Sequence, residues 1–218
     1  TAIVNAGGSI DAAESGTISY SAVIDQSYDD SSPVLTRDTI HNNVTATYNI
    51  SGAGNAQSCL ENSNASVTID DITISKTTIS STTVKPGDIV QFQLSMSIPS
   101  GDADNVILTD VLPLPVFTAT DFPAFTGNLD AYVANNGNDI EYAAGSAKPG
   151  NVTITRSAAS NSINIDFGDI SSANAQTIIL NVYAKASAAP YADGLSLANL
   201  FNATTNNSAS DSVADNTV

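Results

Sequence analysis

The chain has 218 residues, of which 42% are hydrophobic, which is enough to build one or two domains with a real core. Its 22 acidic side chains against 6 Lys and Arg give a net charge of −16. Such a surface repels nucleic-acid phosphates and anionic lipids, so neither is an expected partner. No apolar run approaches the roughly 18–20 residues of a membrane helix, so no membrane insertion is expected.

The remaining composition favours an extracellular location. Ser, Thr, Asn, Asp, Ala and Gly dominate, Trp is absent and Lys is rare, as is typical of secreted surface proteins. The sequence begins at Thr1 without Met, which fits a processed secreted protein or an excised fragment. The single cysteine, Cys59, allows no internal disulfide. We expect a buried thiol there, with an intermolecular bridge as the alternative.

The first third of the chain is β-prone and nearly free of helical periodicity. Turn clusters recur along the whole chain every ~8–14 residues, which indicates a β-sandwich. Strands are predicted at 2–4, 17–24, 39–50 and 65–76, with a polar loop at 51–62 that holds Cys59. The alternation in the third of these strands places Ile40, Val44, Ala46 and Tyr48 in a core.

The stretch 74–115 has the strongest pattern. A Pro-Gly turn at 86–87 precedes a strand with a strict period of two. Its inward residues are predicted to be Val90, Phe92, Leu94 and Met96. A polar turn at 99–102 and a second β-rich run at 105–112 complete a predicted hairpin-like unit. Further strands are expected at 152–155, 162–167, 177–184 and 195–204, followed by a polar tail from 206.

Three segments recur in the same order, which indicates an internal repeat. Residues 8–18 match 168–178, residues 40–47 match 197–204, and residues 66–67 match 212–213. We therefore predict that 1–70 is the second half of a β-sandwich module and that 71–218 is a complete one. The boundary is placed at Asp70-Asp71.

Half a sandwich exposes apolar faces and unpaired strand edges, so residues 1–70 need a cover. The rest of a longer chain, the 71–218 module or a strand from a neighbouring subunit could supply it. Strand addition between subunits builds head-to-tail filaments. Ala2-Ile3-Val4, isolated by Gly7-Gly8, is the candidate donor strand, and an ordinary edge strand is the alternative.

A family resemblance rests on several short motifs in a fixed order. They are Lys76, Lys85-Pro86-Gly87-Asp88, Asn105-Val106, Thr109-Asp110-Val111-Leu112-Pro113, Phe167-Gly168-Asp169-Ile170 and Asn199 with Asn202-Ala203-Thr204. This order resembles the bacterial and archaeal cell-surface repeat domain of unknown function numbered eleven. The resemblance implies an immunoglobulin-like antiparallel sandwich used in tandem in adhesins, stalks and envelope layers. Ile98-Pro99-Ser100-Gly101 departs from the Asn-Pro or Asn-Gly pair usual in that family.

Surface sandwiches of Gram-positive type can join a Lys on the first strand to an Asn on the last, with a buried acid as catalyst. Here Lys76, with Asn199 or Asn202 and with Asp88 or Asp110, occupies suitable strands. The candidate isopeptide set is Lys76, Asn202 and Asp88. The lysine must be buried and neutral to attack. The alternative is that Lys76 is an ordinary edge-strand charge.

Oxygen-rich turns suggest Ca²⁺ as the one possible cofactor. Asp102, Asp104 and Asn105 are the candidate metal ligands, and solvated acidic turns are the alternative. Asp29-Asp30 and Asn138-Asp139 with Glu141 are similar.

Six asparagines head an Asn-x-Ser/Thr triplet and are candidate glycosylation sites. They are Asn43, Asn49, Asn64, Asn151, Asn202 and Asn206.

No catalytic set can be built from the sequence. The only histidine, His41, has no Ser or Cys arrangement around it, and a sugar cleft normally needs aromatic platforms, whereas this chain has no Trp and few Tyr. We therefore expect a structural extracellular protein rather than an enzyme. It would be a filament subunit or a repeat segment of a surface protein, assembled through strand complementation, with copies of itself or flanking repeats as partners. The alternative is an adhesin module that binds a glycan, ice or a protein.

Overall fold

The computed structural model describes residues 17–25, 27–32, 34, 37–50, 57–192, 194–206 and 211–216. For 49, 50, 57–59 and 211–216 it describes the backbone only. Within this part of the chain there is no helix long and apolar enough to cross a membrane.

Strands account for nearly all the regular structure. They are β1 (Thr39–Ile50), β2 (Gln57–Thr68), β3 (Thr73–Thr78), β4 (Ile89–Ile98), β5 (Gly101–Val111), β6 (Phe125–Asn128), β7 (Asp139–Tyr142), β8 (Asn151–Ser157), β9 (Ser162–Ser172), β10 (Gln176–Lys185), β11 (Ala198–Thr204) and β12 (Asp211–Asn216). Two short 3₁₀ turns lie at Ala119–Asp121 and Leu129–Ala131.

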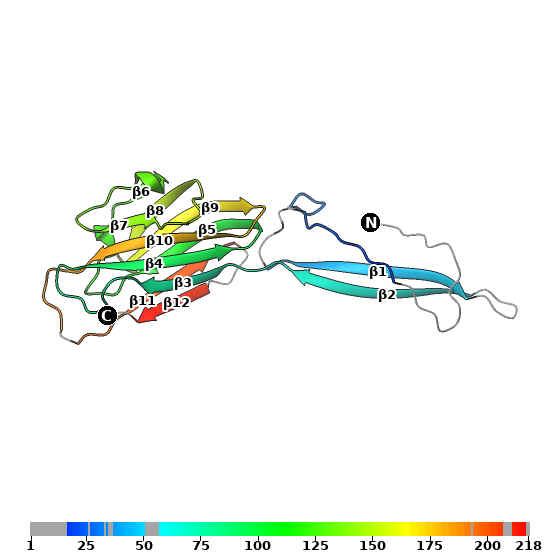
Figure 1. Cartoon of the computed structure of the whole chain (residues 1–218), viewed down its shortest axis with the longest axis horizontal. Helices are drawn as coiled ribbons and strands as arrows, with labels where there is room; N and C mark the ends of the chain where they lie inside the picture. Colours follow the sequence, from blue (N-terminus) through cyan, green and yellow to red (C-terminus); the bar gives the residue numbers. More distant parts are fainter. Residues whose placement is uncertain are drawn as a thin grey trace.

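Strands β3 to β12 form a sandwich of two antiparallel sheets (Figure 1). One sheet has the order β3-β4-β10-β7, and the other has the order β12-β11-β5-β9-β8-β6. The first sheet corresponds to strands A, B, E and D of an immunoglobulin domain, and β5, β11 and β12 correspond to C, F and G. The predicted fold class, an all-β immunoglobulin-like antiparallel sandwich, is confirmed for this part of the chain.

The sandwich core follows from period-two patterning. In β4 the residues Val90, Phe92, Leu94 and Met96 are buried, as predicted. The strand β10 pairs with β4 and buries every second residue in the same way. Its buried residues are Ile178, Leu180, Val182 and Ala184. Two complementary apolar faces therefore meet between the sheets.

The predicted hairpin of β4 and β5 is corrected. The two strands follow each other directly, but β4 pairs with β3 and β10, whereas β5 pairs with β9 and β11. The turn between them crosses from one sheet to the other, because each strand needs its apolar face turned toward the same core.

Ahead of the sandwich, β1 and β2 form a two-stranded antiparallel sheet that extends away from it (Figure 1). The bounds of β1 are those predicted. Its inward face is not: Ile40 is half-buried and Ala46 is exposed, as are Val44 (49%) and Tyr48 (45%). Part of the expected loop at 51–62 belongs to β2. The stretch 17–25, predicted as a strand, has no strand partner in the described chain.

The second and third repeat matches fall on paired strands, whereas of the first match, 8–18, only 17 and 18 lie within the described residues. β1 and β2 pair antiparallel, as β11 and β12 do. The third match is out of register, because Val67 lies opposite Ile40 whereas Val213 lies opposite Phe201, the counterpart of Val44. That residues 1–70 are half a module completed by another segment or subunit stays a prediction.

Candidate isopeptide site

Lys76 projects into the sandwich from β3, the first strand of the sheet pair. The inward positions of this strand are Ile74, Lys76 and Thr78, and Lys76 alone among the three is fully buried. Its side chain is 0% exposed. A lysine head group in this position has lost its hydration shell, which is costly unless a partner compensates.

Asp110 is that partner. It lies on β5 in the opposite sheet, in phase with the buried residues Val106 and Leu108. Its Oδ1 atom accepts a hydrogen bond from Lys76 Nζ and forms an ion pair with it. The contact therefore crosses the core from one sheet to the other.

Asn199 faces the same interior from β11, the strand paired with β5. Phe201 lies directly opposite Asp110, and Asn199 is the next inward residue of β11. Asn199 is therefore diagonal to Asp110 on one face of the sheet, at a spacing that side chains can bridge. The strand β3, which carries Lys76, packs against β11 and β12 along this side of the sandwich.

Aromatic rings enclose the amine. The Nζ atom of Lys76 lies 4.8 Å from the centroid of the Phe92 ring. Phe92 in turn packs edge to face on Phe117, with ring centroids 5.9 Å apart. Phe201, opposite Asp110, is completely buried. Water is thus kept from the polar groups, so electrostatic interactions here act in a low dielectric.

Three polar atoms at this site are left without hydrogen-bond partners. They are Oδ2 of Asp110 and both side-chain atoms of Asn199, and all are buried. A buried polar group without a partner costs about 1–3 kcal/mol. A buried ion pair is itself weak support for a fold, because desolvation offsets the attraction. Non-covalent stability alone therefore explains this arrangement poorly.

Burial raises the pKa of the Asp110 carboxyl, although the ammonium of Lys76 acts in the opposite direction through its charge and its hydrogen bond. Burial thus disfavours the charged form of the Asp110 carboxyl, which makes transfer of a proton from the Lys76 ammonium to it easier. A neutral amine is a nucleophile, and a carboxamide beside a carboxylic acid is an electrophile. Lys76, Asp110 and Asn199 are thus the nucleophile, the acid and the electrophile that an amide between Lys76 and Asn199 would need.

The set named from the sequence is corrected at two positions. Asp88 is exposed in the turn before β4, where its carboxylate accepts a hydrogen bond from the backbone N–H of Lys85 at 2.9 Å. Asn202 is half-buried and lies one residue out of phase with Asn199 on β11. Lys76 stays in the set, with Asp110 and Asn199 beside it. The sequence contained the information needed to find this set, because all three are polar residues at positions of an alternating strand that face the core.

The predicted Ca²⁺ ligands lie at the start of β5. Burial raises the pKa of the Asp104 carboxyl, and the charges of Asp169 and Asp102 act in the same direction. Asn105 is tied to its neighbours, since its N–H donates to Asp169 Oδ1 and its Nδ2 donates to Asn206 Oδ1. In the described residues no three His, Cys, Asp or Glu side chains gather as a metal-holding group. A Ca²⁺ site stays a prediction.

Most other predicted sites lie on the surface or outside the described residues. The glycosylation candidates Asn43, Asn64, Asn151 and Asn206 are exposed, and Asn202 is half-buried. The side chains of Asn49 and Cys59, and the donor strand Ala2-Ile3-Val4, lie outside what the structure describes. His41 is exposed on β1.

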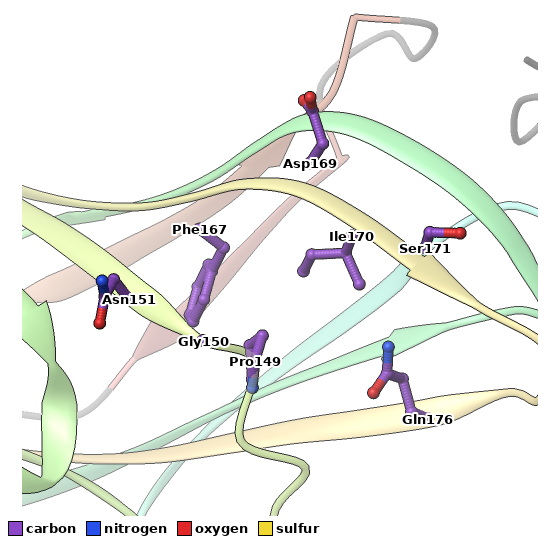
Figure 2. Close-up of a pocket in the computed structure, with 8 residues that line it drawn as sticks. All are labelled: Pro149, Gly150, Asn151, Phe167, Asp169, Ile170, Ser171 and Gln176. Carbon is purple, nitrogen blue, oxygen red and sulfur yellow. The ribbon is translucent and has the colours of Figure 1, made fainter.

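Two shallow hollows lie at the end of the sandwich near β10. One, of about 370 Å³, is lined by residues that include Phe167, Ile170 and a single carboxylate, Asp169 (Figure 2). The other, of about 500 Å³, includes Asp70 and Asp71, and Asp71 is ion-paired with Arg37. Neither holds the aromatic platforms expected of a sugar cleft.

Comparison with known proteins gives likeness at the level of solved structures only. No protein-family model matches the sequence, and no curated protein does. A C-terminal domain of the Streptococcus agalactiae antigen I/II polypeptide BspA is similar with TM-score 0.46 and 13% identity, over 82% of this chain and 57% of that one. The C-terminal domain of the Streptococcus pyogenes antigen I/II-family protein AspA is similar with TM-score 0.42 and 14% identity, over 80% and 54%. The chain thus spans little more than half the length of these structures.

Proposed function

We propose that this chain is an extracellular structural module whose sandwich is closed by an isopeptide bond between Lys76 and Asn199. It would serve as a repeat segment of a surface protein or as a subunit of a surface filament. The observation that carries this proposal is the buried constellation of Lys76, Asp110 and Asn199, in which the carboxamide has no hydrogen-bond partner. The acidic, lysine-poor composition supports the extracellular location.

The bond would form in one self-contained step. Asp110 takes a proton from the Lys76 ammonium, and the neutral Nζ attacks Cγ of Asn199. Protonated Asp110 donates to the developing oxyanion at Oδ1 and then helps the amide nitrogen to leave. One C–N bond forms, one C–N bond breaks, ammonia departs, and the proton that came from the Lys76 ammonium remains on Asp110. The reaction occurs once per molecule without turnover, so the protein would not be an enzyme.

Such a bond would be useful in a protein that bears mechanical load. Lys76 lies near the beginning of the sandwich and Asn199 near its end, so a bond between them closes almost the whole module into one loop. Tension that enters at β3 and leaves at β11 would pass through the side-chain amide. The strands between them would then carry no force. Non-covalent sandwiches yield by losing ladder hydrogen bonds, each worth only about 1 kcal/mol net.

The mass of the intact, purified chain tests the proposal. We expect a mass lower than that of the sequence by one ammonia molecule, and a tryptic cross-linked peptide that contains Lys76 and Asn199. The variant Asn199→Ala should keep its full mass. The matched variant Asn202→Ala, on the same strand but out of phase, should still lose ammonia. A wild-type chain with its full mass would overturn the proposal.

A further inference from the structure

The two-stranded sheet of β1 and β2, called the β1–β2 arm below, resembles β11 and β12, which form the asparagine side of the isopeptide site. The described residues place no counterpart of the lysine and aspartate side beside it. The match of residues 40–47 to 197–204 pairs Asn42 with Asn199, Val44 with Phe201 and Ala46 with Ala203. In β11 all three counterparts are buried. In β1 the same phase is open to solvent, and Val44 is 49% exposed. β1 therefore carries a second copy of the face that holds Asn199 in β11, and this copy is exposed to solvent.

The stretch before β1 shows the same relation to β10. Residues Ile18, Tyr20 and Ile24 correspond to Ile178, Leu180 and Ala184, which are completely buried. Here Ile18 is 61% exposed, Tyr20 65% and Ile24 46%. The hydroxyl of Tyr20 accepts a hydrogen bond from Nδ2 of Asn42. The side chain of Tyr20 thus reaches Asn42 on β1.

Comparison with the complete module shows which partner strands the described part of the chain does not place beside 17–25 and β1. There, β11 pairs with β12 on one edge and with β5 on the other, whereas β1 pairs only with β2 in the described chain. In the same module β10 pairs with β4, and β4 pairs with β3. The partner strands that the described residues do not place there therefore include those equivalent to β4 and β5, with β3 beside β4; in the complete module β3 supplies the lysine and β5 the acid.

We infer that the described stretches 17–25, 39–48 and 60–68 are an acceptor for a β3–β5-type segment of another polypeptide that lacks its own β11, so that its lysine is not already bonded, and that Asn42 becomes covalently joined to this lysine. The inference rests on the proposed function, because it applies the same chemistry between two polypeptides. The incoming lysine amine attacks Cγ of Asn42, ammonia leaves and the incoming aspartate keeps the proton. The product is a covalent link between neighbouring modules.

The occupant follows from the fit that the chain itself displays. A β5-type strand along the free edge of β1 would place its aspartate opposite Val44, as Asp110 lies opposite Phe201. A β4-type strand would pair with 17–25 as β4 pairs with β10, and its apolar residues would extend the face that carries Ile18 and Tyr20. A small ligand would offer neither ladder hydrogen bonds nor an amine at the right place.

A peptide added to the intact chain tests this inference. The probe is a synthetic peptide of residues 72–111, mixed with the full-length protein and followed by denaturing gel electrophoresis and intact mass spectrometry. We expect an adduct whose mass is the sum of the two minus one ammonia molecule, with fragment spectra that join Lys76 of the peptide to Asn42. In the wild-type chain Asn199 is already joined to its own lysine and cannot compete.

Matched variants identify the acceptor. Asn42→Ala in the chain, or Lys76→Ala in the peptide, should abolish the adduct. Asn43→Ala, adjacent on β1 but facing the opposite side, should leave it unchanged. Absence of an adduct, or an adduct that persists in Asn42→Ala, overturns the inference. If the chain alone has lost ammonia while the peptide fails to react, the proposed function stands and only this inference fails.

Discussion

Lys76, Asp110 and Asn199 occupy strand positions that normally hold apolar side chains. Each is in phase with inward-facing neighbours on its own strand: Lys76 with the half-buried Ile74, Asp110 with the buried Leu108, and Asn199 with the buried Phe201. Desolvating an ammonium and a carboxylate costs several kcal/mol per ion. Burying these charges therefore destabilises the fold, and amide formation, which leaves Asp110 protonated, would replace two charged groups by two neutral ones.

A substitution of the acid tests its role at the residue scale. Asp110→Ala should keep its full mass, because no group remains to accept the lysine proton. It should also unfold more easily than Asn199→Ala, by about 3–5 kcal/mol, because Lys76 is left without its carboxylate in the core. Because both variants lack the isopeptide bond, the difference between their free energies of unfolding in urea measures only the loss of the Asp110 carboxylate as the partner of Lys76.

The acid named from the sequence provides the control for this experiment. Asp88→Ala should still lose ammonia, since Asp88 lies in an exposed turn. Loss of ammonia from Asp110→Ala would show that a different group carries the proton.

The sequence alone could identify the residues of the site as polar residues that face the core, but it could not show that they meet there. Period-two alternation places Asp110 and Asn199 on inward faces, and the same alternation places Asn202 outward. What a strand pattern cannot give is which inward residues of two opposing sheets meet, because this depends on the offset between the sheets. Asp88 and Asp110 therefore looked equivalent in the sequence.

At the scale of elements, local pattern predicts strands well and their partners poorly. β1, β4 and β10 lie where alternation placed them. The assignment of β4 and β5 to one hairpin failed, because the short turn between them gives no information on which sheet each strand joins. β2 extends through half of a predicted polar loop, where pairing with β1 overrides weak local preference.

One turn depends on an asparagine that the sequence analysis did not single out. Asn161, between β8 and β9, is buried and has a φ of 47°. Its Nδ2 donates to the carbonyls of Leu112 and Phe117 at 2.7 and 2.9 Å, and its Oδ1 accepts from the N–H of Ala119 at 2.8 Å. A single side chain thus fastens the 112–119 loop to the β8–β9 turn.

Asn161→Ala should therefore lower the free energy of unfolding by about 2–4 kcal/mol, from unpaired buried groups and from the left-handed backbone. Asn161→Gly loses the same hydrogen bonds but tolerates the backbone, so it should be less destabilised, by about 1 kcal/mol. Chemical denaturation followed by circular dichroism measures both variants. Equal stability of Ala and wild type would contradict the role assigned to this side chain.

At the scale of the whole molecule, the proposed bond changes how the chain extends under force. In single-molecule pulling from the two ends, the wild-type chain should not release the residues between Lys76 and Asn199. Asn199→Ala should release them as additional length of roughly 400 Å, at about 3.3–3.6 Å per residue. Asn202→Ala should behave as wild type. Full extension of the wild-type sandwich would be incompatible with a covalent closure.

The overall architecture was only partly accessible from the sequence. The complete sandwich follows from alternation and turn chemistry, because its strands find their partners within the chain. The β1–β2 arm and the stretch 17–25 carry equally clear strand patterns, yet they expose Ile18, Tyr20 and Val44. A strand pattern predicts that one face is buried but does not show which segment buries it, so the covering of this region by another segment or subunit stays a prediction.

The last strand of the sandwich, β12, would respond to mechanical force differently from the other strands. β12 is the edge strand of its sheet and follows Asn199 in the chain, so it lies outside the loop that the Lys76–Asn199 amide would close. A pull on the C-terminal side meets the ladder of β12 on β11 first. That short ladder can be peeled away and can zip back on release, while everything behind the amide keeps its shape. The module would then combine an inextensible body with one reversible, sacrificial strand at its end.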